Sequence, residues 1–253
     1  MVGDRVSCVD SVIDEVLPRK NFLARLRGDR QRRSHIGYEQ QIIVANLDLA
    51  VIVAAAKSPA FHPKFIDRYL VVCQSGGVPA AICLNKSDLA GDPPSLSIYE
   101  NLGIPVVRTS AANGTGIAAL QQFIMGKTVA FVGTSGVGKS SLANALLPDA
   151  NIKANAISTK TDKGRHTTTS SSFYEWAPNS YLIDTPGIRA LGLENMDKES
   201  LQYYFPEFEP FVGTCKFNNC SHLHEPGCAV KQALENQQIS EGRYESYARM
   251  MGE

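Results

Sequence analysis

From Leu47 onward, short apolar runs alternate with longer amphipathic stretches. Leu49–Ala56 is a continuous apolar run, as expected for a strand that is buried on both faces. Four further runs have the same character, and amphipathic stretches of helix length, such as Pro63–Gln74 and Gly116–Met125, lie between them. These runs are Ala80–Leu84, Ile104–Val107, Val129–Val132 and Tyr181–Ile183. Strands that alternate with helices predict an α/β domain with a mostly parallel sheet.

The two ends of the chain lack this alternation. Short stretches with a period of two lie within Val2–Val9 and Asp10–Leu17, and they predict β-strands. From about Leu193 the apolar runs stop, and the chain closes with a helical pattern from Glu241 to Met251. We therefore expect three units: a β module at 1–46, an α/β domain at 47–192 and a small α-helical module at 193–253.

Composition narrows the class of protein. The 253 residues are 43% hydrophobic, which allows a sizeable core and excludes collagen-like and wholly disordered chains. No apolar run approaches the ~20 residues that cross a bilayer, and no apolar signal core follows Met1. We therefore expect a monomeric cytoplasmic protein with no membrane partner.

The charges are balanced overall but segregated along the chain. Lys plus Arg and Asp plus Glu each total 25, which taken alone argues against a nucleic-acid partner. However, Arg19–Arg33 holds seven basic residues against one acid, and four more cations lie between Lys153 and Arg165. The basic stretch is either a solvated loop or edge-strand face, or a phosphate-binding surface. The distribution favours an RNA partner.

A phosphate-binding motif follows the predicted strand at 129–132. Gly133–Ser140 has the spacing GxxxxGK[ST], and a helical pattern comes directly after it. Its glycines let the backbone N–H groups face the β-phosphate, and the helix adds its positive N-terminal end. Lys139 would bridge β- and γ-phosphate oxygens, and Ser140 would bind Mg²⁺. The motif predicts a nucleoside triphosphate without specifying its base.

Two downstream segments are expected near the γ-phosphate. Asp184-Thr-Pro-Gly187 ends the predicted strand at 181–183; Asp184 would reach Mg²⁺ through water, and the Gly187 N–H could contact the γ-phosphate. The polar stretch Lys160–Thr169 predicts a loop. One of its threonines, Thr168 or Thr167, would complete the Mg²⁺ shell and make the loop an order–disorder switch.

Two polar motifs after predicted strands point to guanine. They are Asn85-Lys86-Ser87-Asp88 and Thr109-Ser110-Ala111. The Asp88 carboxylate can accept hydrogen bonds from the N1–H and N2–H groups of guanine, and adenine has no such donor pair. Asn85 can hold the other edge of the base, the Lys86 stem can cover the ring, and a backbone N–H of the second motif can contact guanine O6. Together the motifs predict a GTP site.

The order of these motifs is inverted. In ordinary GTPases the phosphate elements come first, whereas here 85–88 and 109–111 precede 133–140 and 184–187. The nucleotide site is therefore expected to be circularly permuted, which leaves its geometry intact if the former termini are close. The permutation also joins the segment at 184–187 directly to the C-terminal module.

The six cysteines fall into two groups. Cys8, Cys73 and Cys83 lie in apolar or strand-like stretches, and we expect them to be buried thiols. The other group, with one histidine, has the spacing Cys-x4-Cys-x-His-x5-Cys and suits tetrahedral Zn²⁺ with no position left open for catalysis. Its members are Cys215, Cys220, His222 and Cys228. His224 is a competing fourth ligand, and three unrelated thiols are the remaining alternative.

Taken in order, these motifs resemble the RsgA (YjeQ) family of circularly permuted GTPases, which act in late maturation of the small ribosomal subunit. The resemblance covers nearly the whole chain from about Val2. It implies an N-terminal OB-fold, a permuted GTPase domain, a C-terminal zinc domain, rRNA binding and subunit-stimulated hydrolysis of GTP to GDP and phosphate. Family members usually carry more residues before the segment that resembles Val2–Val6, so we expect only a partial OB-fold-like module.

The resemblance and the motifs together define the expected site. The zinc ligands would be the three cysteines and His222, and Mg²⁺ would be held by Ser140 and Thr168. The nucleotide contacts would be Asn85, Lys86, Ser87, Asp88, Ser110, Ala111, Gly133, Thr134, Ser135, Gly136, Val137, Gly138, Lys139, Ser140, Ser141, Asp184 and Gly187.

The residue after the 184–187 motif bears on catalysis. Ile188 stands where many GTPases place a water-orienting glutamine, so we expect slow intrinsic hydrolysis that accelerates when the small subunit orders the 160–169 loop. We expect His166 to position water, as the resemblance also implies, with Lys139 and Thr168 as its catalytic partners. The alternative for His166 is contact with an rRNA phosphate.

Two other functions stay open: a nucleotide-gated binding module with incidental hydrolysis, and an ATPase or kinase, which Asp88 disfavours.

Overall fold

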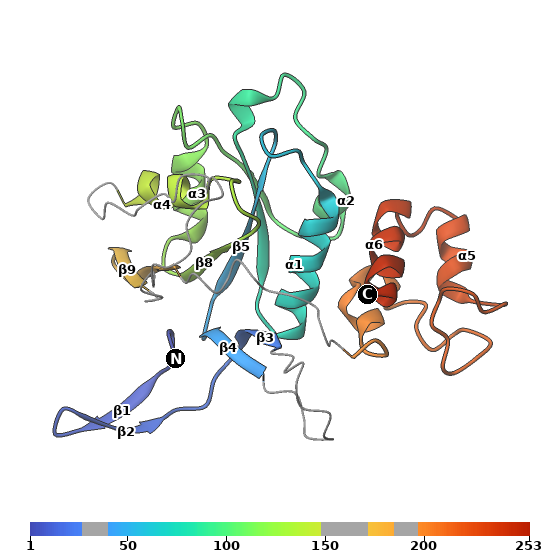
Figure 1. Ribbon diagram of the computed structural model, residues 1–253, viewed down its shortest axis with the longest axis horizontal. Coiled ribbons are helices and arrows are strands. Elements are labelled where there is room, and N and C mark those ends of the chain that lie inside the picture. Colours follow the sequence, from blue (N-terminus) through green and yellow to red (C-terminus); the bar gives the residue numbers. More distant parts are fainter. Residues whose placement is uncertain (27–39, 148–171, 185–196) are drawn as a thin grey trace, which may run out of the picture.

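A six-stranded sheet forms the centre of the molecule (Figure 1). The computed structural model describes residues 1–26, 40–147, 172–184 and 197–253. The strand order is β7-β6-β5-β8-β10-β9, and every neighbouring pair is parallel except β9 and β10. The strands are β5 (Leu49–Ala55), β6 (Ala80–Asn85), β7 (Val106–Arg108), β8 (Thr128–Val132), β9 (Ser172–Ala177) and β10 (Ser180–Asp184).

Helices cover both faces of this sheet (Figure 1). Alternate β5 side chains enter two separate cores: Ala50 and Ile52 pack on the side of α1 and α2, and Val51 and Val53 on the side of α3 and α4. The continuous apolar run at 49–56 is therefore a strand buried on both faces, as predicted, and the predicted α/β fold is confirmed. The helices are α1 (Pro63–Ser75), α2 (Ser97–Asn101), α3 (Ile117–Ile124) and α4 (Lys139–Leu146).

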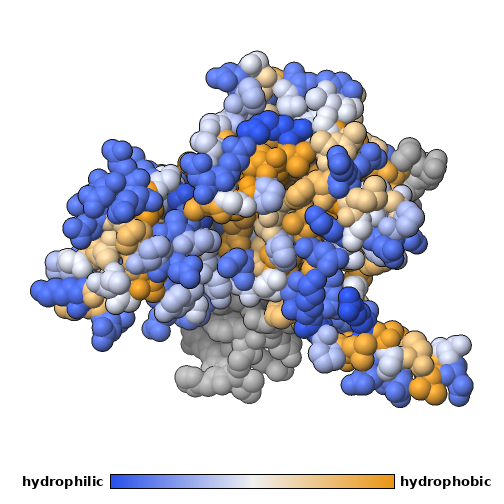
Figure 2. Space-filling view, turned by 180° about the vertical axis from the view of Figure 1, so that it is seen from behind, coloured by the Kyte–Doolittle hydropathy of each residue, from blue (hydrophilic) through white to orange (hydrophobic). Residues whose placement is uncertain are grey.

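The described part of residues 1–46 forms two antiparallel pairs. β1 (Val6–Val9) and β2 (Val12–Val16) make a hairpin that projects from the body (Figures 1 and 2). Its apolar residues are exposed to solvent; Val12, for example, is 67% exposed. Cys8 is exposed as well. The expectation of a buried Cys8 thiol is wrong because Cys8 lies on this exposed hairpin; Cys73 and Cys83 are buried as expected.

The second pair joins the main core. β3 (Phe22–Leu26) pairs with β4 (Gln40–Ala45), and Leu23 and Val44 are fully buried in the same cluster as the inner face of α1. β3 and β4 thus pack the N-terminal part of the chain against the core around α1, whereas the β1–β2 hairpin extends away from that core.

The C-terminal module packs on the outer side of α1. Its described residues, 197–253, form two short 3₁₀ helices and two α-helices, and the predicted helix from 241 to 251 is confirmed. Phe205, Phe208 and Tyr247 form an aromatic cluster in which Tyr247 meets both phenylalanine rings edge-on, and these side chains extend the core around α1. The elements are η4 (Leu201–Tyr204), η5 (Pro206–Phe208), α5 (Ala229–Glu235) and α6 (Glu241–Gly252).

A buried ion cluster joins α1 to this module. Arg243 of α6 donates to Asp67 of α1 over 2.7 Å and to Glu207 of η5 over 2.6 Å. The same Asp67 carboxylate accepts hydrogen bonds from the hydroxyls of Tyr99 and Ser246. Asp67 and Arg243 are each about 1% exposed, so all charges of the pair are compensated away from water.

None of the helices in the described ranges is long and apolar enough to cross a lipid bilayer.

Candidate functional site

The predicted phosphate loop joins β8 to α4. Gly133, Gly136 and Gly138 all have positive φ angles, and α4 begins at Lys139. A Cβ at Gly133 would lie 2.4 Å from the Val53 carbonyl oxygen. The backbone therefore curls as the motif requires, and a side chain at Gly133 would push the loop away from β5.

Two lysines bind to the carbonyl groups of this loop. The Lys139 ammonium donates to the carbonyl oxygens of Gly133 over 2.7 Å and Thr134 over 2.6 Å. Lys86 reaches the loop from the base side: it donates to Gly136 O over 2.7 Å and also to Ser58 O. Both cations thus lie at the loop that is expected to receive the phosphates.

Asn85 holds the base motifs and the phosphate loop together. Its Nδ2 donates to Val137 O over 3.0 Å, and its Oδ1 accepts from the Ala111 N–H over 3.1 Å and the Thr109 hydroxyl over 3.2 Å. Asn85 is fully buried. A Cβ at Gly138 would lie 2.2 Å from its Nδ2, which shows how tightly the two segments fit.

This arrangement follows from the sheet order. β6, β7 and β8 are parallel members of one sheet, so the motifs after them emerge at the same edge. Ser87 N–H donates to Thr109 O over 3.1 Å, which ties the two base motifs directly. Asp88 lies in the exposed part of the 3₁₀ turn Ser87–Leu89, and Ser110 is fully buried.

The remaining members of the expected site fall into two groups. Thr134, Ser135, Ser140 and Ser141 lie in the loop or the first turn of α4, and Asp184 is the last residue of β10, whose carboxyl end shares that edge. The residues His166, Thr167, Thr168, Gly187 and Ile188 lie outside the described residues.

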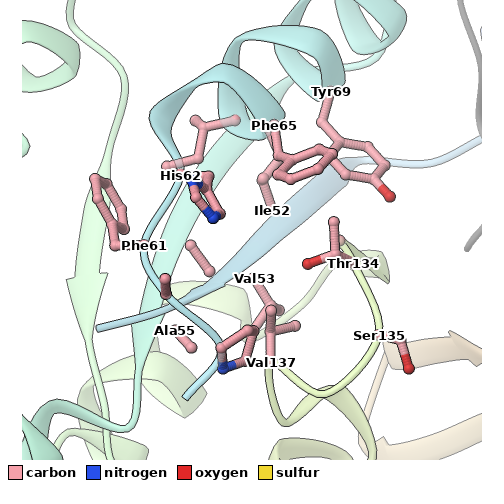
Figure 3. A pocket seen from close by; sticks show the side chains of 15 residues that line it. Ile52, Val53, Ala55, Phe61, His62, Phe65, Tyr69, Thr134, Ser135 and Val137 are labelled. Carbon is pink, nitrogen blue, oxygen red and sulfur yellow. The ribbon is translucent and has the colours of Figure 1, made fainter. Parts of the chain in front are cut away.

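A pocket of about 210 Å³ adjoins the outer side of the phosphate loop (Figure 3). Figure 3 shows Phe65 and Tyr69 of α1 across from Thr134 and Ser135. Burial raises the pKa of the Tyr69 hydroxyl, against the opposing effect of a hydrogen bond from the backbone of Gly133. One face of α1 therefore touches the phosphate loop, and Asp67 on the same helix faces the C-terminal module.

The described cations of the basic stretch are paired with acids. Arg19 donates to Asp4 over 2.7 Å and holds the pKa of that carboxyl well below its usual value. Lys20 donates to Asp48 over 2.8 Å. Arg25 and the four arginines from 27 to 33 have side chains outside the described residues. The predicted phosphate-binding surface thus gains no unpaired cation from Arg19 or Lys20.

The predicted metal ligands converge in the C-terminal module. Three thiols and one imidazole place their ligand atoms within 4.8 Å of one another; they belong to Cys215, Cys220, His222 and Cys228. His224 is exposed and lies outside this group, so the structure favours His222 over the competing ligand. The convergence of the three thiols argues against the alternative of three unrelated thiols.

The spacing of the ligand atoms in the cluster fits a tetrahedral ion. Ligands ~2.0–2.3 Å from Zn²⁺ would be about 3.5–3.8 Å apart. The separations are 3.3 Å from His222 Nδ1 to Cys228 Sγ, 3.5 Å to Cys215 Sγ and 3.9 Å between the two sulfurs. Burial lowers the pKa of His222, favouring the neutral imidazole, and raises the pKa of the Cys220 and Cys228 thiols, so thiolates here need a nearby cation.

Backbone and side-chain groups around the cluster were not anticipated from the sequence. Ala229 N–H donates to Cys215 Sγ over 3.3 Å, and Lys231 N–H donates to Cys228 Sγ over 3.4 Å at the start of α5. Gln202 Oε1 lies 2.8 Å from His222 Nε2. A glutamine within the segment Leu-Gln-Tyr-Tyr carries no spacing signal, so sequence reasoning could not find it.

Comparison with known proteins identifies relatives for nearly the whole chain. The sequence profile of the RsgA GTPase family matches residues 16–194. "Small ribosomal subunit biogenesis GTPase RsgA 2" of Bacteroides thetaiotaomicron is 39% identical over 99% of this chain and 82% of its own length. "Small ribosomal subunit biogenesis GTPase RsgA" of Gemmatimonas aurantiaca is 38% identical over 100% of this chain and 83% of its own length.

Two solved structures share the fold. YjeQ from Thermotoga maritima superposes with a TM-score of 0.77 at 35% identity, covering 99% of this chain and 82% of that one. YloQ, described as a circularly permuted GTPase, superposes with a TM-score of 0.73 at 30% identity, covering 99% of this chain and 79% of that one. The permuted order read from the motifs is thus a property of a solved relative.

Proposed function

This chain belongs to the RsgA GTPase family and is a GTP hydrolase of ribosome biogenesis, and from that premise we propose that the small ribosomal subunit stimulates its hydrolysis of GTP. The products are GDP and phosphate, and the protein acts late in maturation of that subunit, bound to its rRNA. The observation that best supports the site is the Asn85 amide, which contacts both the Thr109–Ala111 motif and Val137 of the phosphate loop.

In this proposal the base and phosphates occupy one sheet edge. Asp88 accepts the two N–H donors of guanine, the Lys86 stem covers the ring and the Ala111 segment lies at O6. The backbone of 133–138 and the N-terminus of α4 bind the phosphates, assisted by Ser141. On nucleotide binding, Lys139 exchanges the carbonyl oxygens of Gly133 and Thr134 for phosphate oxygens. The Lys139 ammonium is therefore already at the loop before the nucleotide binds, and the phosphate oxygens then neutralise its charge.

The residues present also fit Mg²⁺, which prefers oxygen ligands and retains waters. The Ser140 hydroxyl is half-buried in the first turn of α4, and Asp184 ends a strand at the same sheet edge. When bound, Mg²⁺ neutralises charge on the phosphates. We propose Ser140 and Thr168 as direct ligands, Asp184 as a ligand through water, and the Gly187 N–H as the contact to the γ-phosphate.

For the cluster in the C-terminal module we propose one structural Zn²⁺ per chain. Three thiolates and one imidazole complete a tetrahedron and leave no position for substrate. A module of this size has a small core of its own, so metal binding would contribute much of its folding free energy.

The three-unit division at 46/47 and 192/193 stays a proposal, with the monomeric state and the cytoplasmic location. The exposed β1–β2 hairpin supports a distinct N-terminal module, for which we propose rRNA binding. The buried cluster around α1 contains residues from all three proposed units.

Hydrolysis itself separates this proposal from a nucleotide-gated binding module. A single-turnover measurement of GTP cleavage, with and without small subunits, distinguishes them. Stimulated cleavage supports the GTPase proposal, and cleavage at the same slow rate in both conditions supports a binding module in which hydrolysis is incidental.

Replacing His166 with alanine tests the proposed water-positioning role. We expect subunit-stimulated turnover to fall about 10²-fold, the lower end of the effect of a positioned acid–base group, while GTP affinity is unchanged. Stopped-flow phosphate release at saturating subunits measures the first, and equilibrium binding measures the second. His224→Ala, which changes an exposed histidine, is the control. Unchanged turnover at saturation with weaker subunit binding would assign His166 to an rRNA phosphate instead.

A further inference from the structure

The two ring nitrogens of His222 face different partners. Nδ1 lies 3.3 Å from Cys228 Sγ and 3.5 Å from Cys215 Sγ, at the centre of the metal cluster. Nε2 points the other way and lies 2.8 Å from Gln202 Oε1 in η4. A histidine that binds a metal through one nitrogen needs its proton on the other, and the partner of that second nitrogen selects the tautomer.

The orientation of the Gln202 amide is fixed from its far side. Its Nε2 donates to Glu199 O over 3.0 Å, which leaves Oε1 as the atom that faces the imidazole. An amide oxygen only accepts hydrogen bonds, so His222 Nε2 must carry the proton. The lone pair of the neutral ring is then on Nδ1, directed at the three cysteines.

The backbone of His222 is held independently of this contact. Its φ angle is +61°, its carbonyl oxygen accepts the Tyr244 hydroxyl over 2.7 Å, and its ring meets Phe208 nearly at a right angle. The residue is 1% exposed, so water cannot easily replace the glutamine as acceptor. These constraints place the ring, and Gln202 supplies the acceptor that selects its tautomer.

We propose that Gln202 is a positioning residue of the metal centre: it holds His222 with Nε2 protonated, so that Nδ1 is the metal ligand. The inference rests on the proposed metal site. Gln202 belongs to η4, and η4 also packs against α1. The residue that orients the His222 ligand therefore lies in an element that holds the C-terminal module on α1.

The test uses Zn²⁺ and three variants of the full chain, with affinity measured by competition against a chromophoric chelator. Gln202→Ala should weaken Zn²⁺ binding about 10–100-fold, the usual cost of losing such a partner of a ligand. Gln202→Glu keeps an acceptor and should stay within a few-fold of the parent chain. Gln238→Ala, an exposed glutamine of the same module, should be unchanged. Wild-type affinity in Gln202→Ala would overturn the proposal.

A tautomer measurement on the parent chain keeps the proposal testable if a variant does not fold. In a long-range ¹H–¹⁵N spectrum of the Zn²⁺-loaded protein, His222 should show a protonated Nε2 and a metal-bound Nδ1. A metal-bound Nε2 would contradict the role of Gln202 while leaving the metal site itself intact. Failure of the parent chain to bind Zn²⁺ would instead contradict the metal site on which the inference rests.

Discussion

Replacing Asp67 with alanine will destabilise the protein by about 3–5 kcal/mol, because it leaves a buried guanidinium without one of its two carboxylates. The Asp67 and Arg243 side chains are each 2% exposed, so water cannot replace the lost carboxylate, and Glu207 remains the one acid paired with Arg243 in the described part of the chain. The substitution also removes the acceptor of the Tyr99 and Ser246 hydroxyls. Urea unfolding should report the loss, followed by far-UV circular dichroism for the whole chain and by the single tryptophan, Trp176, for the sheet.

Arg68→Ala is the matched control on the same helix. Arg68 also pairs with the C-terminal module, through Glu253, but their side chains are 25% and 43% exposed. A solvent-exposed pair of this kind contributes about 0–1 kcal/mol. A loss for Asp67→Ala no larger than that for Arg68→Ala would contradict the claim that the buried cluster holds the module on α1.

A second replacement distinguishes lost charge pairing from lost packing. Changing the whole cluster to apolar residues, with Asp67→Leu, Glu207→Leu and Arg243→Met, removes every charge at once. We expect this variant to be more stable than Asp67→Ala, since it leaves no charged group of the cluster and no broken ion pair in the core.

Replacing Asp88 with asparagine will weaken GTP binding about 10–100-fold, as expected from the loss of a hydrogen bond that involves a charged acceptor. The Asp88 side chain is exposed at the sheet edge beside Lys86, so the change should not disturb the core. Binding of ATP should stay as weak as before. Xanthine carries a carbonyl where guanine has its N2 amine, so the new amide should bind XTP better than the parent chain does.

Equilibrium titration with labelled GTP, ATP and XTP measures this shift in base preference. Asp92→Asn makes the same charge change on an exposed loop of the same domain and should leave all three affinities unchanged. If Asp88→Asn and Asp92→Asn bind GTP equally well, the guanine-reading role of Asp88 is wrong, and an ATPase or kinase function regains support.

The sheet could be predicted largely from the sequence because its parallel strands are buried on both faces. The runs at 49–56, 80–84 and 129–132 each became a strand within one residue of their predicted ends. β9 was not predicted, although three of its six residues are aromatic and favour strands: it is an antiparallel edge strand with Phe173 half exposed, so it lacks the continuous apolar run of the buried strands.

The motifs predicted the location of the site but not the contacts that build it. The spacing of 85–88 predicts a base-reading element, yet the burial of Asn85 and its bond to Val137 depend on the sheet order. The ion pair between Asp67 and Arg243 joins residues 176 positions apart, and neither belongs to a motif. Such contacts arise from tertiary packing and leave no local periodicity.

The turnover of GTP by the full chain, with and without purified small ribosomal subunits, tests the central claim most directly. We predict slow release of phosphate from GTP alone, a rise of about 10²-fold or more when subunits are present in excess, and no comparable release from ATP. A GTP turnover that subunits leave unchanged, or an equal turnover of ATP, would contradict the proposal of a guanine-specific hydrolase that the small subunit activates.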